Sequence, residues 1–378
     1  MSKSLNDYVT LGRSGLRVSP LCLGTMTFGN EWGWGSEEET ARAVFDRYLD
    51  GGGNFIDTAD LYTEGHTEEL LGKFIGERGL RDRLVLATKF TFNPEPGNPN
   101  TGGNGRKNIY RALEHSLRRL RTDYIDLYWL HAWDTVTPVE EVVSTLNDLV
   151  RAGKIRHYGF SNAPAWYIAR AMTLAEHEGK ERLVALQLEY SLVERNIERE
   201  HIPAAQELGL GITPWSPLAG GFLSGKYQRQ GDSGQGEGRL EITKAVPNPG
   251  FQRFKERNCQ ILDVVLDVAK QINRPPAQVA LNWAATQPGI TSTIIGASKP
   301  AQLEDNLRSI EFEIPQELRK HLDGVSAPDP GYPYEFFNPG MQGRISGGTN
   351  VQPWAPARTY APPSVEPQAG VKVNAAAK

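Results

Sequence analysis

Short apolar segments alternate with longer amphipathic ones from residue 20 to about residue 310, and this alternation is the strongest constraint on the fold. Continuous apolar strands that alternate with helices indicate parallel β-α units, and eight such units predict a closed (β/α)8 barrel of the TIM type. An open doubly wound sheet is the alternative, but no predicted strand is followed by the glycine-rich dinucleotide fingerprint of such sheets. The eight predicted strands are short, rich in β-branched or aromatic residues and bounded by polar or turn-forming ones: Leu21–Thr25, Phe55–Ala59, Leu84–Phe90, Ile125–His131, Ile155–Asn162, Ala185–Ser191, Gly211–Leu218 and Thr291–Ser298.

The amphipathic segments between the strands carry helix-end signals. Ser36 and Glu39 have the spacing of a capping box, which predicts a helix over Thr40–Leu49 that stops at the glycines 51–53. Two further helices follow a proline at a position that a first turn tolerates. They are Val139–Arg151 after Pro138 and Ala165–Ala175 after Pro164.

Three segments lie outside the repeat. Tyr8–Gly12 and Leu16–Val18 are predicted to form a hairpin that covers the bottom of the barrel. Gly220–Gly250 is a long, glycine-rich loop after the seventh strand, on the barrel face that carries function. We therefore expect a barrel domain over residues 1–327 and a Pro/Gly-rich tail over residues 328–378. The first part of the tail is expected near the barrel mouth, and its end, Val371–Lys378, is expected to be disordered.

The composition favours a globular protein of the cytoplasm. The formal net charge of -4 disfavours nucleic acid or an anionic membrane as the main partner. Cys22 and Cys259, the two cysteines, are far apart and form no CxxC motif, which fits a reducing compartment. Residues 1–10 lack the pattern of a signal peptide, and apolar runs such as Leu183–Leu188 are too short to cross a bilayer. A homo-oligomer is compatible with the sequence.

Four polar residues occupy equivalent places at or just past the ends of predicted strands, where barrel enzymes hold their reacting groups. Asp57 and Tyr62 follow the second strand, Lys89 lies near the end of the third, and His131 ends the fourth. A tyrosine titrates near pH 10, and a nearby ammonium makes its proton easier to release. Lys89 would supply that charge, Asp57 would hold Lys89, and His131 would orient a substrate carbonyl. Such a site stabilises the alkoxide that hydride delivery to a carbonyl carbon creates.

Each of these residues also has a simpler explanation. Taken alone, Asp57 could be a helix cap, Tyr62 could be a packing residue, and His131 could be a structural histidine. Lys89 is harder to explain in that way, because a lysine buried in a strand without a partner is costly. The joint placement of all four favours function.

Two stretches have the features of anion cradles. The segment from Ile294 to Lys299 runs from the eighth strand into a helix that begins near Pro300, and barrels often bind phosphate there. The segment from Trp215 to Gly221 ends the seventh strand with small residues that let backbone approach a ligand. A turn with a helix cap would explain either stretch alone.

Together these motifs resemble the aldo-keto reductase superfamily over about residues 9–325. The segment from Phe55 to Tyr62, followed by Glu68-Glu69-Leu70-Leu71-Gly72, is similar to its Asp-and-Tyr motif. Lys89 and His131 match the other two members of its catalytic tetrad. The resemblance implies reversible, NADPH-dependent reduction of aldehydes or ketones, with Tyr62 as general acid–base.

The resemblance also implies a set of cofactor-binding residues. Many members carry a lysine where Gly296 stands, so Lys299 is expected to hold the 2′-phosphate. Trp215 stands where many members stack a tyrosine on the nicotinamide. The full set is Gly24, Thr25, Met26, Asp57, Ser161, Asn162, Gln187, Trp215, Ser216, Pro217, Leu218, Gly220, Lys226, Gly296, Ser298, Lys299, Gln302, Asp305 and Asn306.

The stretch from Trp215 to Tyr227 is similar to the potassium-channel β-subunit and aryl-alcohol dehydrogenase branches. Aromatic residues predict an open pocket for aryl or polycyclic carbonyl compounds, lined by Trp32, Trp34, Tyr62, His131 and Trp133. A cofactor-sensing regulatory subunit with weak catalysis is the alternative, which the intact tetrad disfavours. A metal-dependent hydrolase that uses His66 or His131 is less supported, because no His-x-His or His-Glu-x-x-His motif occurs, so no metal site is expected.

Overall fold

The computed structural model describes residues 3–230, 233–235, 240, 252–329 and 331–349. The chain divides into two compact units, Met1–Pro328 and Asp329–Lys378. In the described part of the second unit lie a 3-10 helix, η7 (Tyr334–Phe337), and the short helix α12 (Pro339–Ile345). Val371–Lys378 falls outside the described residues, and a tail near the barrel mouth remains a prediction.

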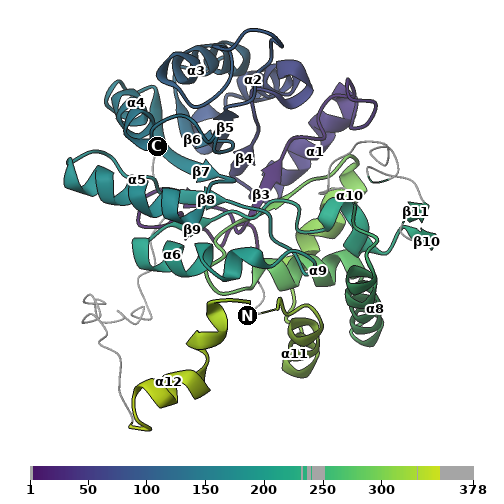
Figure 1. Cartoon of the computed structure of the whole chain (residues 1–378). Coiled ribbons are helices and arrows are strands. Elements are labelled where there is room, and N and C mark those ends of the chain that lie inside the picture. The colour runs from purple at the N-terminus through teal and green to yellow at the C-terminus, as the bar shows by residue number, and fades with distance from the viewer. Residues whose placement is uncertain (1–2, 231–232, 236–239, 241–251, 330, 350–378) are drawn as a thin grey trace, which may run out of the picture. The chain divides into compact units, whose positions relative to one another are not determined.

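The first unit contains an eight-stranded parallel sheet in which each strand pairs with the next one along the chain (Figure 1). Backbone N–H groups of Thr291 and Ile294 donate to the carbonyls of Ile212 and Pro214, each at 2.9 Å, and so join the last strand to the seventh. All eight predicted strands are confirmed, in the sheet order β12-β3-β4-β5-β6-β7-β8-β9. Their bounds are β3 (Leu21–Gly24), β4 (Phe55–Asp57), β5 (Val85–Phe90), β6 (Ile125–Leu130), β7 (Ile155–Ser161), β8 (Ala185–Gln187), β9 (Gly211–Ile212) and β12 (Thr293–Ile295).

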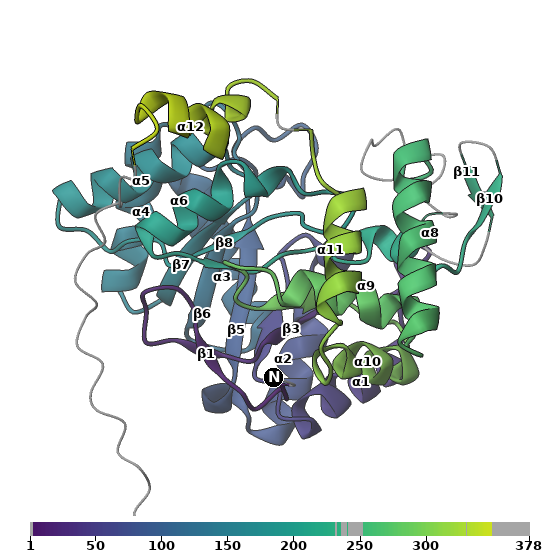
Figure 2. The ribbon, with the colours of Figure 1, turned by 90° about the horizontal axis from the view of Figure 1, so that it is seen from below.

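Helices surround the strands, and each buries its apolar face on them (Figure 1). The helices between or after strands are α1 (Glu38–Asp50), α2 (His66–Arg78), α3 (Arg106–Leu120), α4 (Val139–Arg151), α5 (Ala165–His177), α6 (His201–Leu208), α9 (Pro276–Ala285) and α10 (Pro300–Leu307). Two more, α8 (Glu256–Gln271) and α11 (Gln316–Val325), lie side by side (Figure 2). Short 3-10 turns are η1 (Tyr62–Gly65), η2 (Arg81–Arg83), η3 (Asn196–Glu198), η4 (Ala219–Ser224) and η6 (Arg308–Ile310).

The predicted capping box at the start of α1 is wrong. The Ser36 hydroxyl donates to the Ser298 carbonyl at 3.0 Å, and the position before the helix is Glu37, whose side chain makes no capping bond. The reason is the backbone pairing of Ser36 with Gly29, which turns the serine away from the helix. A tertiary contact therefore takes the place of the local one.

The predicted hairpin is confirmed as β1 (Val9–Thr10) paired antiparallel with β2 (Arg17–Val18). Leu11 and Val18 pack inside the barrel with Trp129 and other inward side chains. Gly12 (φ +61°) lies against the chain just before β8 and β9, where an added Cβ would be 2.4 Å from the Val184 carbonyl oxygen. The hairpin therefore closes the N-terminal end of the barrel and leaves its C-terminal end for ligands.

After β9, the glycine-rich insertion contains a second antiparallel pair, β10 (Gln228–Gln230) with β11 (Ser233–Gln235). Much of the rest of the insertion falls outside the described residues. Among the described helices, none has an apolar stretch of the length that a bilayer requires.

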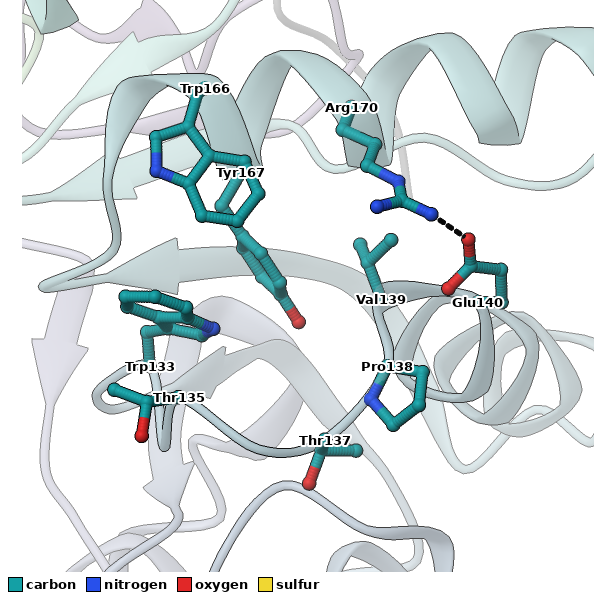
Figure 3. A pocket seen from close by; sticks show the side chains of 9 residues that line it. All are labelled: Trp133, Thr135, Thr137, Pro138, Val139, Glu140, Trp166, Tyr167 and Arg170. Atoms are coloured by element: carbon teal, nitrogen blue, oxygen red, sulfur yellow. Dashed lines mark hydrogen bonds and ion pairs between the residues drawn. The ribbon is translucent and has the colours of Figure 1, made fainter.

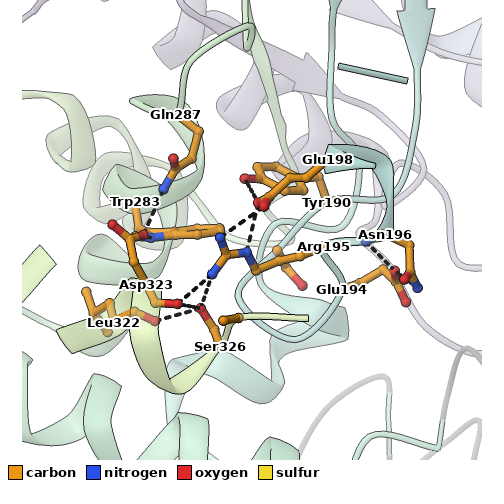
Figure 4. A network of polar contacts seen from close by, with 12 residues as sticks. Tyr190, Glu194, Arg195, Asn196, Glu198, Trp283, Gln287, Leu322, Asp323 and Ser326 are labelled. Atoms are coloured by element: carbon orange, nitrogen blue, oxygen red, sulfur yellow. Dashed lines mark hydrogen bonds and ion pairs between the residues drawn. The ribbon is translucent and has the colours of Figure 1, made fainter. Parts of the chain in front are cut away.

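A half-buried arginine ties the loop after β8 to the last helix of the barrel (Figure 4). The Arg195 guanidinium donates to Glu198 Oε1 at 2.8 Å, to the Asp323 carbonyl at 2.8 Å and to Ser326 Oγ at 2.7 Å. Trp283 lies beneath it, 5.1 Å from the guanidinium carbon, and donates its indole N–H to Asp323 at 2.7 Å. These contacts fix α11 against α9 at the end of the barrel domain.

Candidate active site

The four predicted catalytic residues converge at the C-terminal ends of β4, β5 and β6. Asp57 ends β4, Tyr62 opens η1, Lys89 lies in β5, and His131 directly follows β6. The register of the parallel strands sets how far each residue lies along the barrel axis: Asp57 pairs with Ala87, and Lys89 pairs with Trp129. The structure thus brings together the four residues that the sequence placed at neighbouring strand ends.

Lys89 is the centre of the cluster and is fully buried at 0% exposure. Its ammonium donates to Asp57 Oδ2 at 2.5 Å, to the Thr58 carbonyl at 2.6 Å and to Tyr62 Oη at 3.2 Å. All three of its N–H groups therefore have acceptors. Gln187, at the end of β8, donates to the other Asp57 oxygen at 2.8 Å and so completes the pair from the opposite side.

Charge states at the site follow from burial and from this ion pair. Burial alone would lower the pKa of Lys89, but the adjacent Asp57 and Tyr62 outweigh it and raise that pKa. Burial, and secondarily the Lys89 charge, hold the pKa of His131 well below its usual range. At neutral pH the site therefore pairs a charged lysine with an uncharged imidazole. His131 Nδ1 is buried and has no hydrogen-bond partner among the described residues.

The turn that carries Tyr62 is strained. Thr63, Glu64 and Gly65 have φ values of +46°, +58° and +96°, in the left-handed region that only glycine adopts readily. Thr67 anchors the turn: its hydroxyl lies 2.7 Å from that of Thr63 and donates to the Phe28 carbonyl at 2.8 Å. The anchor fixes the backbone beside the phenol. Nothing in the sequence pattern predicted this anchor.

Aromatic rings surround the phenol and the imidazole. Trp32 meets Tyr62 edge-on at 6.3 Å between ring centroids, and Trp34 packs on Trp32 at 5.6 Å. Phe92 lies edge-on to His131 at 4.8 Å and was missed, although its place two residues past β5 is the signal that would have found it. Trp133 packs instead against Trp166 and Tyr167.

Several of the predicted nicotinamide residues lie together beside this cluster. Asn162, with φ +48°, donates its amide to the His131 carbonyl at 2.9 Å and accepts from the Trp215 indole at 3.2 Å. The Ser161 hydroxyl is buried and has no partner among the described residues, so it can bond to a ligand. The Gln187 amide nitrogen, by contrast, is already bonded to Asp57.

The two predicted anion cradles lie past β9 and β12. Ser216, Ala219, Gly220 and Gly221 all have positive φ, between +50° and +92°, so the chain around Pro217 and Leu218 is tightly turned. Lys226, further along, is exposed.

At the second cradle, Lys299 directly precedes α10, and Gln302 Oε1 accepts from both the backbone N–H (3.0 Å) and the hydroxyl (3.1 Å) of Ser298. Asn306 donates to the Gly296 carbonyl, whereas Asp305 accepts from Gln278 on α9.

The end of β3 adjoins the second cradle. Thr25 donates through both its backbone N–H and its hydroxyl to the Asp57 carbonyl, at 3.0 Å each. Thr27 donates to the Ala297 carbonyl at 2.8 Å, which ties residues 24–27 to the chain past β12. An added Cβ at Gly24 would come within 2.6 Å of the Ile294 side chain, so this position accepts only a glycine without rearrangement.

In the part of the chain that the structure describes, no group of three or more His, Cys, Asp or Glu side chains is placed to hold a metal ion. His66, one of the two histidines considered, is half-exposed and pairs with Glu31.

Comparison with known proteins agrees with the geometry. The model of the Aldo/keto reductase family matches residues 20–327. The chain is 34% identical to an aryl-alcohol dehydrogenase of Pestalotiopsis microspora (89% of this chain, 85% of the relative) and 37% identical to a norsolorinic acid reductase of Emericella nidulans (86% and 82%). It is 31% identical to an aryl-alcohol dehydrogenase [NADP(+)] of Phanerodontia chrysosporium, with 88% of each chain covered. The buried lysine, its carboxylate and the tyrosine beside them are thus the polar centre of a barrel oxidoreductase, and the chain belongs to the aldo/keto reductase family.

Proposed function

We propose that this protein reduces aromatic aldehydes or ketones with NADPH, reversibly, and that Tyr62 transfers the proton. The observation that carries the proposal is the fully buried Lys89 ammonium, which Asp57 holds in place and which donates to Tyr62 Oη at 3.2 Å. A purely structural ion pair would not need the third contact to a phenol. The family match supports oxidoreductase chemistry on carbonyls.

Proton transfer follows from the charges. An unperturbed phenol is a weak acid at neutral pH, and the Lys89 cation stabilises the phenolate that remains after the proton has moved to the substrate oxygen. Asp57 and Gln187 act on Lys89 rather than on the substrate, because they keep the ammonium charged and in position. A neutral His131 can donate one hydrogen bond to the carbonyl oxygen without competing for the proton.

The residues at the strand ends fit a nicotinamide dinucleotide. The unpaired Ser161 hydroxyl and the Asn162 amide are suited to a carboxamide, and the half-buried Trp215 offers a ring for stacking. The left-handed backbone at Ser216 and at residues 219–221 is suited to phosphate groups, as is the start of α10 with Ser298 and Lys299. When bound, NADPH supplies the hydride that reaches the carbonyl carbon.

The aromatic substrate class rests on two observations. Trp32, Trp34 and Phe92 line the approach to Tyr62 and His131 with flat apolar surface. Two relatives are named as aryl-alcohol dehydrogenases and a third as a norsolorinic acid reductase. We also place the protein in a reducing cytoplasm, which the unbridged, buried Cys22 and Cys259 support.

The test is a titration with NADPH and NADH, followed by nucleotide oxidation with an aromatic aldehyde. We expect NADPH to bind about 10- to 100-fold more tightly than NADH, from charged hydrogen bonds to its 2′-phosphate. Lys299→Ala should remove most of that preference, while Lys270→Ala, an exposed lysine on α8, should leave it unchanged. Equal affinity for the two nucleotides would remove the assigned role of Lys299. Tight binding with no turnover of a broad carbonyl panel would favour a cofactor-sensing protein instead.

A further inference from the structure

A cavity lies outside the catalytic cluster, between the first turns of α4 and α5 (Figure 3). Its volume is about 230 Å³, and Trp133, Pro138, Val139, Trp166, Tyr167 and Arg170 are among the residues that line it. None of the four residues of the Asp57, Tyr62, Lys89 and His131 cluster belongs to its lining. The catalytic proposal therefore does not account for this cavity.

Three aromatic rings form one side of the cavity. Trp133 meets Trp166 at 5.4 Å between centroids, with the rings perpendicular, and lies 5.8 Å from the Tyr167 ring. Trp166 leaves 57% of its surface exposed, although it belongs to this otherwise packed aromatic group. Flat rings at right angles provide both a stacking face and an edge for a planar guest.

A polar group without a partner lies at the same place. The Tyr167 hydroxyl is buried and has no hydrogen-bond partner among the described residues. It points toward the space between Trp133 and Pro138 (Figure 3). Burial raises the pKa of Tyr167, so the phenol stays neutral and can donate. A buried, unpaired hydroxyl is costly, and a ligand oxygen that accepts from it would remove that cost.

The charges around the cavity favour an uncharged acceptor over an anion. Val139 and Glu140 belong to the first turn of α4, where the N–H groups of Glu141 and Val142 already donate to the Pro138 carbonyl. Arg170 pairs with Glu140 at the rim, so the two side-chain charges offset each other (Figure 3). Burial, and then the nearby negative charge of Asp134, raises the pKa of Tyr167, so the acceptor on the guest is an uncharged carbonyl rather than a carboxylate.

We propose that this cavity binds an uncharged aromatic compound that carries a carbonyl oxygen. The ring lies against Trp133 and Trp166, and the oxygen accepts a hydrogen bond from Tyr167. A cavity of about 150 Å³ holds a benzene ring, so about 230 Å³ has room for a bicyclic guest. The proposal stands independently of the chemistry assigned to Tyr62, since the two sites share no hydrogen-bonding group.

The test is a calorimetric titration with benzamide, an uncharged aromatic carbonyl compound, in the absence of nucleotide. Tyr167→Phe should weaken binding about 2- to 10-fold through loss of one hydrogen bond. Trp166→Ala should weaken it by a similar factor through loss of ring contact. Tyr8→Phe is the matched control, because its hydroxyl bonds to Gly52 near the N-terminal hairpin, and it should bind like wild type.

Two further measurements keep the outcome interpretable. Tyr167→Phe should unfold at or above the wild-type midpoint, because the hydroxyl it removes is buried and has no partner in the described protein. Trp32→Ala, beside Tyr62 in the catalytic cluster, should leave the affinity for benzamide unchanged. Equal affinity of wild type, Tyr167→Phe and Trp166→Ala would overturn the proposal. So would absence of binding at millimolar benzamide, or loss of binding in Trp32→Ala alone.

Discussion

Replacement of Lys89 by methionine tests the ion pair at the centre of the site. Asp57 is 2% exposed, and without the ammonium its carboxylate would keep only the Gln187 hydrogen bond. Removal of one partner from a buried pair typically costs about 3–5 kcal/mol of unfolding free energy, because the other charge stays buried and unpaired. We expect a loss of that size for Lys89→Met. Reduction of an aromatic aldehyde should also fall by about 10²- to 10⁴-fold, because Tyr62 loses its cation.

The assay is guanidinium denaturation at pH 7 of Lys89→Met, Asp57→Asn and the double variant. The double variant should lose less stability than the two single losses added together, because both remove the same interaction. Arg106→Met is the control, since its pair with Asp148 is exposed (45% and 43%) and such pairs contribute at most about 1 kcal/mol. If Lys89→Met unfolds within about 1 kcal/mol of wild type, the ion pair does not hold the site together.

Three further predictions concern the surroundings of this pair. Burial, and secondarily Glu68, raise the pKa of Asp60 to about 7, so the folded state binds a proton that the unfolded chain releases near pH 4. Stability from this group is therefore lost as pH rises toward 7. Between pH 4 and pH 8, the unfolding free energy of Asp60→Asn in urea titrations should rise by about 2–4 kcal/mol relative to that of wild type. An equal difference between the two proteins at both pH values would contradict this. Gly65→Ala forces a Cβ into the φ +96° turn, 2.9 Å from the Arg119 side chain. It should lower kcat for an aromatic aldehyde at least tenfold by moving Tyr62, and wild-type kcat would show that the turn does not position the phenol. Gly296→Lys fits without a clash, since an added Cβ meets no atom within 4 Å, and it should raise the NADPH-over-NADH affinity ratio about tenfold in fluorescence titrations; an unchanged ratio would place the 2′-phosphate elsewhere.

The strand pattern predicted the barrel because each strand is a continuous apolar run, which depends only on local sequence. Strand ends were less predictable. The seventh predicted strand, Gly211–Leu218, is regular only to Ile212, although Thr213 and Trp215 still donate to the carbonyls of Leu186 and Leu188 at 2.9 Å each. The sixth stops at Gln187, although an isolated bridge from Glu189 to Trp215 continues its course.

At the site, residue types at strand ends were sufficient to bring Asp57, Lys89 and His131 together, because parallel strands align their ends. What the sequence left open depends on tertiary contacts. Ser36 has the spacing of a cap but bonds to Ser298, far along the chain. The left-handed turn after Tyr62 depends on a carbonyl of Phe28, which no local pattern reveals. The separation of Trp133 from the catalytic rings is likewise a matter of packing.

Single-turnover oxidation of NADPH by Tyr62→Phe tests the central claim most directly. The substitution removes only the hydroxyl that accepts from Lys89, so nucleotide affinity should stay within about twofold of wild type. Reduction of an aromatic aldehyde should slow by at least about 10²-fold, the lower end of what a positioned general acid contributes. Wild-type turnover in Tyr62→Phe, with nucleotide bound, would show that another group transfers the proton.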